Sequence, residues 1–327
     1  MTHPVPGRGS LRSRGAALVS TLTLRQISAA LPPEHAWGLW LSRRILAGVM
    51  DTFGPPLAGA RAEKVDGVLP DGRRVVGEWV RAPGVETTSS AIFFVHGSGY
   101  ALCSPRTHRR LTSWLSRLTG LPVFVVDYRL APRHRFPTAA DDVRAGWDWL
   151  TGHVPPGRIV VAGDSAGGHL TVDLLLQPDV MAKPAALVLF SPLIDLTLGL
   201  ARAREALRRD PAIRVADAAR LLKLYMRGVD PTHQRLTLDV AGGPALPPTL
   251  IQAGGAEMLL GDARRLADNI RTGGGHCELQ VWPDQVHVFQ ALPRLSPEAA
   301  KAMAYVARFI TTSLRTSGFD AVAGKAG

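Results

Sequence analysis

Short, continuously apolar runs recur along the chain, as expected of strands that are buried on both faces of a sheet. The run Ala91–Val95 shows this most clearly, and the strand-like stretch Arg74–Arg81 precedes it. Similar runs follow at Pro122–Asp127, Arg158–Ala162, Ala185–Phe190, Thr249–Gln252 and Glu278–Trp282. Residues with helical spacing lie between most of these runs, at Leu111–Leu118, Ala139–Leu150, His169–Leu176 and Asp262–Ile270, and a last helix is expected at Pro297–Leu314. Buried strands that alternate with helices predict an open, mostly parallel α/β sheet.

Two segments depart from this alternation. The first 55 residues are helical in pattern: Trp37, Trp40 and Leu41 recur at helical spacing before the breaker Gly54-Pro55-Pro56. Arginines precede the mostly apolar stretch Gly15–Leu24, which predicts an amphipathic helix rather than a cleaved signal peptide.

The second departure lies between Asp195 and Pro247, where helical patterns at Ala201–Arg208 and Ala216–Met226 replace any buried strand. We interpret this segment as an insertion that pairs with the N-terminal helices over one edge of the sheet.

Composition narrows the class of protein. The 327 residues, 46% hydrophobic, suffice for one elaborated domain or two modest ones. The net charge of +11 would suit nucleic acid or an anionic membrane surface, but the arginines are scattered, so we expect solvated faces and no nucleic acid. Two cysteines, Cys103 and Cys277, suggest a reduced compartment or indifference to redox state. We expect the cytoplasm, with association at the cell envelope left open. No Cys/His cluster has zinc spacing, and no apolar run is long enough to cross a bilayer.

The sequence Gly163-Asp-Ser-Ala-Gly167 follows the predicted strand Arg158–Ala162 and opens a predicted helix. This is a G-x-S-x-G motif in the strand–turn–helix context in which the serine becomes a nucleophile. Such a turn lifts the Ser165 hydroxyl out of the sheet, near a helix N-terminus that favours negative charge. We therefore predict Ser165 as a nucleophile.

A second loop, His96-Gly-Ser-Gly-Tyr100, follows the run that ends at Val95. Acyl transfer needs N–H donors aimed at the developing oxyanion, and in this fold class they come from this loop and from the residue after the nucleophile. The candidate donors are the amides of Gly97, Ser98 and Ala166. His96 is interpreted as a brace for the loop rather than a catalytic base, and Cys103 as a small buried residue.

Together these two motifs resemble those of the hormone-sensitive-lipase-like family of bacterial esterases. A third block, Asp127-Tyr-Arg-Leu-Ala-Pro-Arg-His-Arg-Phe-Pro137 with Asp142, also looks like that family, and the resemblance covers roughly residues 90–314. It implies an α/β-hydrolase fold: an eight-stranded, mostly parallel sheet flanked by helices, with a helical cap. The expected parts are 1–55 (N-terminal helices of the cap), 56–195 and 246–320 (core) and 196–245 (inserted cap segment).

The chain departs from the family pattern at two positions. The family loop usually reads H-G-G-G, and Ser98 replaces its middle glycine here; a backbone donor needs glycine only where φ is positive, so the oxyanion donors are expected to survive. A glutamate of the third block is Arg133 here, which affects surface charge more than chemistry.

The remaining catalytic groups follow the order Ser…acid…His. His287 comes after the last predicted strand and is the predicted base, whereas His276 precedes that strand. Aligning the family's G-x-x-D-P-L on Gly254 and Leu259 puts Glu257 at the acid. Asp262 is the competing candidate, but it begins a helix, where an Asp is usually a cap.

The resemblance then implies a serine carboxylester hydrolase for short- to medium-chain acyl esters that needs no cofactor and no metal. Trp37, Trp40, Tyr100 and Tyr225 are candidates for the substrate pocket. An amidase or deacetylase with the same triad, and a non-catalytic small-molecule receptor, remain as alternatives. A homo-oligomer and peripheral membrane association both stay open.

Overall fold

A single eight-stranded sheet organises the computed structural model, which describes residues 5–86, 89–180 and 182–323. The strands run in the spatial order β1-β2-β4-β3-β5-β6-β7-β8. Their bounds are β1 Arg61–Val68, β2 Arg74–Arg81, β3 Ala91–Val95, β4 Val123–Val126, β5 Ile159–Asp164, β6 Ala186–Phe190, β7 Thr249–Gly254 and β8 Cys277–Trp282. β1 and β2 form an antiparallel hairpin, β2 pairs antiparallel with β4, and the remaining neighbours are parallel. The prediction of an eight-stranded, mostly parallel α/β sheet is confirmed.

The pattern of apolar runs in the sequence did not predict β1. Most of its side chains are exposed and four of its eight residues are charged, since it pairs only with β2 at the edge of the sheet. An edge strand that faces water on both sides carries no apolar run, so its pairing with β2 was not visible in the sequence.

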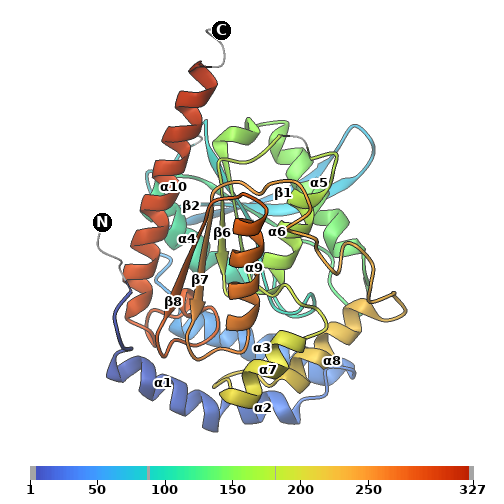
Figure 1. Ribbon diagram of the computed structural model, residues 1–327, viewed down its shortest axis with the longest axis vertical. Coiled ribbons are helices and arrows are strands. Elements are labelled where there is room, and N and C mark those ends of the chain that lie inside the picture. The colour runs from blue at the N-terminus through green and yellow to red at the C-terminus, as the bar shows by residue number, and fades with distance from the viewer. Residues whose placement is uncertain (1–4, 87–88, 181, 324–327) are drawn as a thin grey trace.

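Helices cover both faces of the sheet (Figure 1). α4 (Pro105–Thr119) and α10 (Glu298–Ala323) pack on one face, and α5 (Thr138–Thr151), α6 (Ala166–Leu176) and α9 (Leu260–Thr272) on the other. Strand side chains alternate between the two cores: Phe93 joins α5 and α6, while Ile92 and Phe94 join α4 and α10. Short 3₁₀ turns, η1 (Pro156–Arg158) and η2 (Phe289–Ala291), complete the connections.

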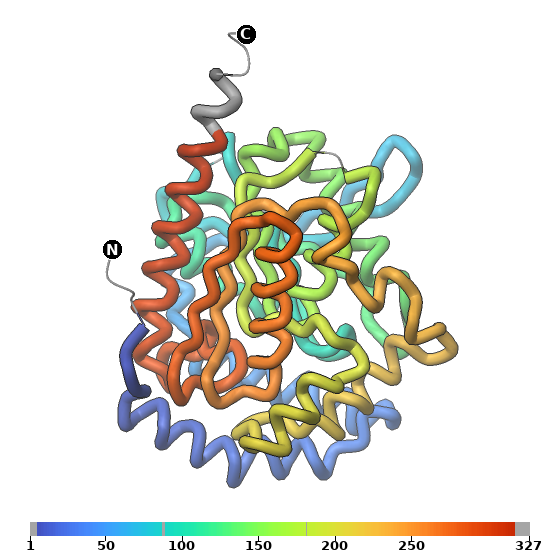
Figure 2. Tube along the Cα trace, in the orientation of Figure 1, coloured from blue at the N-terminus to red at the C-terminus, as the bar shows by residue number. Residues whose placement is uncertain are grey.

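The N-terminal helices lie at one end of this sandwich. They are α1 (Leu11–Leu22), α2 (Leu24–Ala30) and α3 (Ala36–Phe53), and they adjoin α7 (Gly199–Leu207) and α8 (Val215–Met226), as the blue and yellow segments of Figure 2 show. Two ion pairs join the groups, Arg25 with Glu205 at 3.1 Å and Arg220 with Glu34 at 2.6 Å. Helices from the start and the middle of the chain therefore form one layer at this end.

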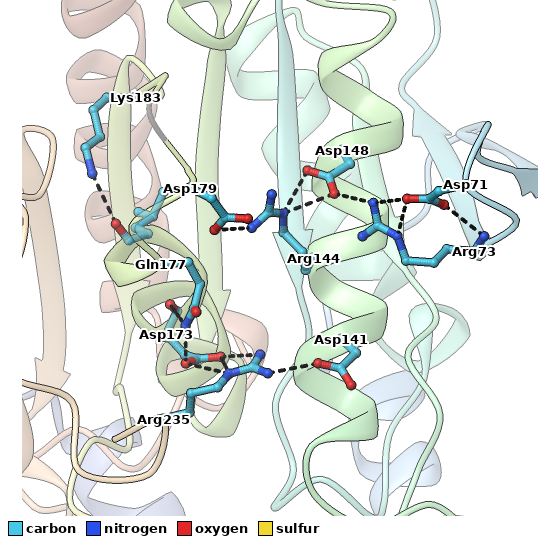
Figure 3. Close-up of polar contacts among 11 residues, drawn as sticks. Asp71, Arg73, Asp141, Arg144, Asp148, Asp173, Gln177, Asp179, Lys183 and Arg235 are labelled. Atoms are coloured by element: carbon cyan, nitrogen blue, oxygen red, sulfur yellow. Dashed lines mark hydrogen bonds and ion pairs between the residues drawn. The ribbon is translucent and has the colours of Figure 1, made fainter. Parts of the chain in front are cut away.

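The chain after α8 is fixed to the core by ion pairs on α5 and α6 (Figure 3). The Arg235 guanidinium donates to Asp173 on α6 at 2.9 Å and to Asp141 on α5 at 2.8 Å. The two carboxylates raise the pKa of Arg235 even though burial alone would lower it. A neighbouring chain of contacts runs from Asp179, after the end of α6, through Arg144 to Asp148, both on α5, and ties this loop to α5.

Within the described residues, no helix is both long and apolar enough to cross a bilayer. Cys103 and Cys277 are buried and unpaired with each other.

Candidate active site

Ser165 occupies the sharp turn between β5 and α6. Its backbone has φ 51° and ψ −121°, a conformation that costs a non-glycine residue roughly 1–3 kcal/mol and is held by the surrounding structure. The amide of Ser165 donates to the Phe190 carbonyl oxygen, and its own carbonyl oxygen accepts from Leu193. Gly167 is required because a Cβ there would collide with the Val95 carbonyl oxygen. The strained turn places the Ser165 hydroxyl beyond the carboxyl end of the sheet.

His287 and Glu257 meet this serine from two other strand ends. The Nε2 atom of His287, after β8, lies 3.0 Å from Ser165 Oγ, and its Nδ1 atom lies 3.0 Å from Glu257 Oε2, after β7. Glu257 is completely buried. With Nδ1 donating to the carboxylate, Nε2 is left to accept a proton from the serine.

Asp262 also follows β7, but its hydrogen-bond partners lie in another loop than His287. Its Oδ1 atom accepts the amides of Ile194 and Asp195 at 2.9 and 2.8 Å, which fixes the loop after β6. Burial raises the pKa of Asp262 to about 7. The structure therefore brings Glu257, and not Asp262, to the histidine.

The histidine and its acid influence each other electrostatically. Burial acts to lower the pKa of His287, but the hydrogen bond and the charge of Glu257 outweigh it, so that the pKa lies above its ordinary value. Burial raises the pKa of Glu257, and the hydrogen bond and charge of His287 oppose that rise. An ionised Glu257 thus favours the protonated form of His287.

Gly97 requires a correction among the three candidate oxyanion donors. Its amide donates to Asp164 Oδ1 at 3.0 Å, so this N–H is not available to an oxyanion. The position still demands glycine, because a Cβ would lie 2.8 Å from Ser165 Cβ. In the described part of the chain, the amides of Ser98, Gly99 and Ala166 donate to no other protein group.

Asp164 belongs to the candidate site but was not singled out by the sequence analysis. Its Oδ1 atom receives both the Gly97 amide and, at 3.2 Å, His108 Nε2 from α4. Burial would raise the pKa of Asp164, but His108 and the neighbouring histidines together lower it. A buried carboxylate directly before the nucleophile therefore joins the nucleophile turn to the loop after β3. Its place inside the G-x-S-x-G motif was the available signal.

Ser98, where the family has glycine, has φ 85°. Glycine would be the unstrained residue here, so the serine costs about 1 kcal/mol or more. Its hydroxyl donates to Cys103 Sγ at 2.8 Å, which partly offsets that cost. Burial raises the pKa of Cys103 to about 11, so this thiol stays protonated and unreactive near neutral pH.

Replacing Ser98 by glycine is therefore expected to stabilise the fold rather than to damage it. We expect a rise in Tm equivalent to roughly 1 kcal/mol, with kcat retained within a few-fold because the donated N–H belongs to the backbone. Calorimetry beside Ser98→Ala, which keeps the strain and loses the hydroxyl, separates the two contributions. A Tm for Ser98→Gly below that of the wild type would contradict the strain argument.

His96 supports the loop, as expected. Its ring stacks on Tyr128 with 4.2 Å between centroids, and the Tyr128 hydroxyl donates to the His96 carbonyl oxygen at 2.7 Å. Burial lowers the pKa of His96 to about 3, so the ring is neutral.

An apolar cavity of about 320 Å³ opens onto Ser165 and His287. Its walls come from α1, α2 and α3, from α8, and from the loops after β3 and β7, and include Ala16, Leu24, Ile45, Val49, Leu221 and Met258. The four pocket candidates do not line it. Tyr100 and Tyr225 are fully buried and stack on each other at 4.0 Å, while Trp37 and Trp40 are exposed on the outer side of α3.

Two contacts join the α7–α8 segment to the loop that carries Glu257. The Asp210 carboxylate accepts the Met258 amide at 2.8 Å, and the Arg204 guanidinium donates to the Gly255 carbonyl oxygen at 2.8 Å. Asp210 is completely buried, and its own carbonyl oxygen accepts from Arg25 on α2. No sequence motif marks either residue, because their partners are backbone atoms far along the chain.

A serine, a histidine and a carboxylate at three strand ends of such a sheet are the arrangement of a serine hydrolase. The model of a family of the alpha/beta hydrolase fold matches residues 92–291. The chain is 37% identical over 257 residues to the carboxylesterase/phospholipase LipF of Mycobacterium tuberculosis (74% of this chain, 68% of LipF). It is 37% identical over 243 residues to the esterase LipU of the same organism (71% of this chain, 82% of LipU).

Among solved structures, an esterase from the bacterial hormone-sensitive lipase family superposes with a TM-score of 0.80 at 31% identity, covering 93% of this chain and 99% of that one. The chain belongs to this family of α/β-hydrolase carboxylesterases.

Proposed function

We propose that Ser165, His287 and Glu257 are the catalytic triad of this carboxylesterase and that its substrates are short- to medium-chain acyl esters. The observation that carries the proposal is the pair of 3.0 Å contacts from Ser165 through His287 to Glu257, at the floor of an apolar cavity.

In the proposed mechanism, His287 Nε2 takes the proton of the Ser165 hydroxyl as its oxygen attacks the acyl carbonyl carbon. Glu257 holds the ring and stabilises its positive charge. The amides of Ser98, Gly99 and Ala166 stabilise the tetrahedral oxyanion, a task that Gly97 cannot share because its amide is bound to Asp164. His287 then protonates the leaving alcohol, and water, activated in the same way, releases the acid from Ser165.

The surroundings of the site support the substrate class and a capping role. A cavity of about 320 Å³ is at the small end of ligand sites, and its walls are mostly apolar. α1–α3 (residues 1–55) and the segment 196–245, which supply much of this wall, are proposed to act as the cap over a core of residues 56–195 and 246–320.

The substrate class is tested by initial rates on p-nitrophenyl esters from acetate to palmitate. We expect the highest kcat/KM at short or medium acyl lengths, because longer chains exceed the cavity. The matched p-nitroanilides should react far more slowly. Rates that keep rising to palmitate, or amides that react as fast as esters, would replace the proposed substrate class.

The pH dependence follows from His287. The base is active only when neutral, and its pKa is raised, so activity is expected to fall on acidification with a midpoint above ~6.5, the value of an unperturbed histidine. Profiles of kcat/KM from about pH 4 to about pH 9 measure this midpoint. In Glu257→Gln the acid limb should shift to lower pH, because the charge that favours the imidazolium is gone. A profile that stays flat down to about pH 4 would rule out His287 as the base.

A further inference from the structure

The outward side of α1 is apolar where a surface helix is normally polar. Leu11, Leu18 and Leu22, spaced seven and four residues apart, fall on one line along the helix and are 81%, 63% and 68% exposed. The side of α1 that faces the protein carries small residues instead, among them Ser13 and Ala16.

α2 and α3 continue this surface. Ile27 on α2 is 40% exposed, and Trp37 and Trp40 on α3 are 58% and 60% exposed. The opposite sides of α1 and α3 line the same cavity, so their exposed leucines and tryptophans point away from it, whereas Ile27 on α2 is both exposed and part of the cavity wall. We call these six residues, Leu11, Leu18, Leu22, Ile27, Trp37 and Trp40, the N-terminal face.

Positive charge flanks the N-terminal face. Of the six arginines in residues 1–53, Arg25 and Arg43 point inward and donate to backbone carbonyl oxygens, whereas Arg8, just before α1, and Arg12 are exposed. The two acidic residues of this stretch, Glu34 and Asp51, are already paired with Arg220 and Arg110. Arg12 is exposed on the flank of the leucine line, and the Arg44 guanidinium lies 5.6 Å from the centre of the Trp40 ring. Apolar side chains, tryptophans and flanking arginines are the features of helices that lie in the interface of an anionic bilayer.

The N-terminal face also adjoins the route to the site. Ile27 belongs both to the exposed surface and to the wall of the cavity that reaches Ser165. A surface placed against α2 would therefore lie beside an edge of the substrate cavity.

We propose that the N-terminal face docks on an anionic phospholipid surface. The leucines, Ile27 and the tryptophans enter the headgroup boundary, and the arginines pair with lipid phosphates. This docking is independent of the proposed chemistry, since binding to vesicles requires no turnover.

The test is co-sedimentation with vesicles of phosphatidylcholine and phosphatidylglycerol, compared with phosphatidylcholine alone, at low and high salt. Wild-type protein should bind the anionic vesicles and be released by salt. Leu18→Gln/Leu22→Gln keeps helix propensity but removes two apolar contacts, and binding should weaken by about tenfold or more. Arg8→Gln/Arg12→Gln should weaken it by about tenfold and reduce its salt dependence.

Val68→Gln is the matched control. Val68, at the end of β1, is as exposed as Leu22 but lies outside the N-terminal helices, so this variant should bind as the wild type does. Hydrolysis of a soluble ester by every variant verifies the fold. The proposal is overturned if the wild-type protein does not bind anionic vesicles, or if the leucine variant binds them as tightly as the wild type does. It is equally overturned if light scattering shows a wild-type dimer that the leucine variant dissociates, because the N-terminal face would then bind a second copy.

Discussion

Ser165→Ala is expected to lower kcat on soluble p-nitrophenyl esters by on the order of 10⁴-fold or more, because it removes the atom proposed to attack the acyl carbonyl. His287→Ala should cause a loss of similar size. The two losses should not add in the double variant, since a nucleophile without its base and a base without its nucleophile fail at the same step. Rates of all three variants, measured with circular dichroism to verify the fold, give the comparison.

His276→Ala is the control for this prediction. His276 precedes β8, at the opposite end of that strand from His287, and its loss should leave kcat unchanged. An organophosphorus ester should label the wild type on Ser165 and leave Ser165→Ala unlabelled. Activity that survives in Ser165→Ala would end the nucleophile assignment.

Glu257→Gln is expected to reduce kcat by roughly 10³- to 10⁴-fold, whereas Asp262→Asn should leave it within about threefold. A glutamine can present its NH₂ group to His287 Nδ1, which forces the proton onto Nε2 and leaves no acceptor for the Ser165 proton. It also removes the charge that stabilises the imidazolium.

Asp262→Asn keeps an oxygen for the amides of Ile194 and Asp195, so its effect should be on Tm rather than on kcat. Steady-state kinetics and thermal unfolding of the two variants side by side separate catalysis from support. A large loss of kcat in Asp262→Asn together with a mild one in Glu257→Gln would reverse the assignment of the acid.

Much of the fold could be predicted from the sequence, because strands that are buried on both faces form recognisable apolar runs. The runs around Ala91–Val95 and Ala185–Phe190 match β3 and β6 closely, since a strand covered on both faces has few polar positions. β1 carried no such signal, because pairing at an exposed edge depends on backbone hydrogen bonds and not on apolar side chains.

The residues of the site could be predicted from the sequence where the order of motifs along the chain constrains them. They could not be predicted where the site depends on the direction of a side chain. Ser165, Glu257 and His287 follow strand ends, and the structure brings them together. Trp37 and Trp40 were chosen as aromatic residues near an expected cap, but helical phase turns both outward. The engagement of the Gly97 amide depends on the rotamer of Asp164, which sequence does not reveal.

The contact between Asp210 and Met258 limits how the α7–α8 segment can move. Swinging that segment away as a rigid lid would break the hydrogen bond between the Asp210 carboxylate and the Met258 amide, next to Glu257, although the carboxylate would keep the amides of Ala212 and Ile213 from its own segment. With Glu257 as the proposed acid, an open segment and an aligned acid would then be competing conformations. The N-terminal helices are tied to the same point, because Arg25 on α2 donates to the Asp210 carbonyl oxygen, so a displacement of either group of helices would be transmitted to the loop that carries Glu257.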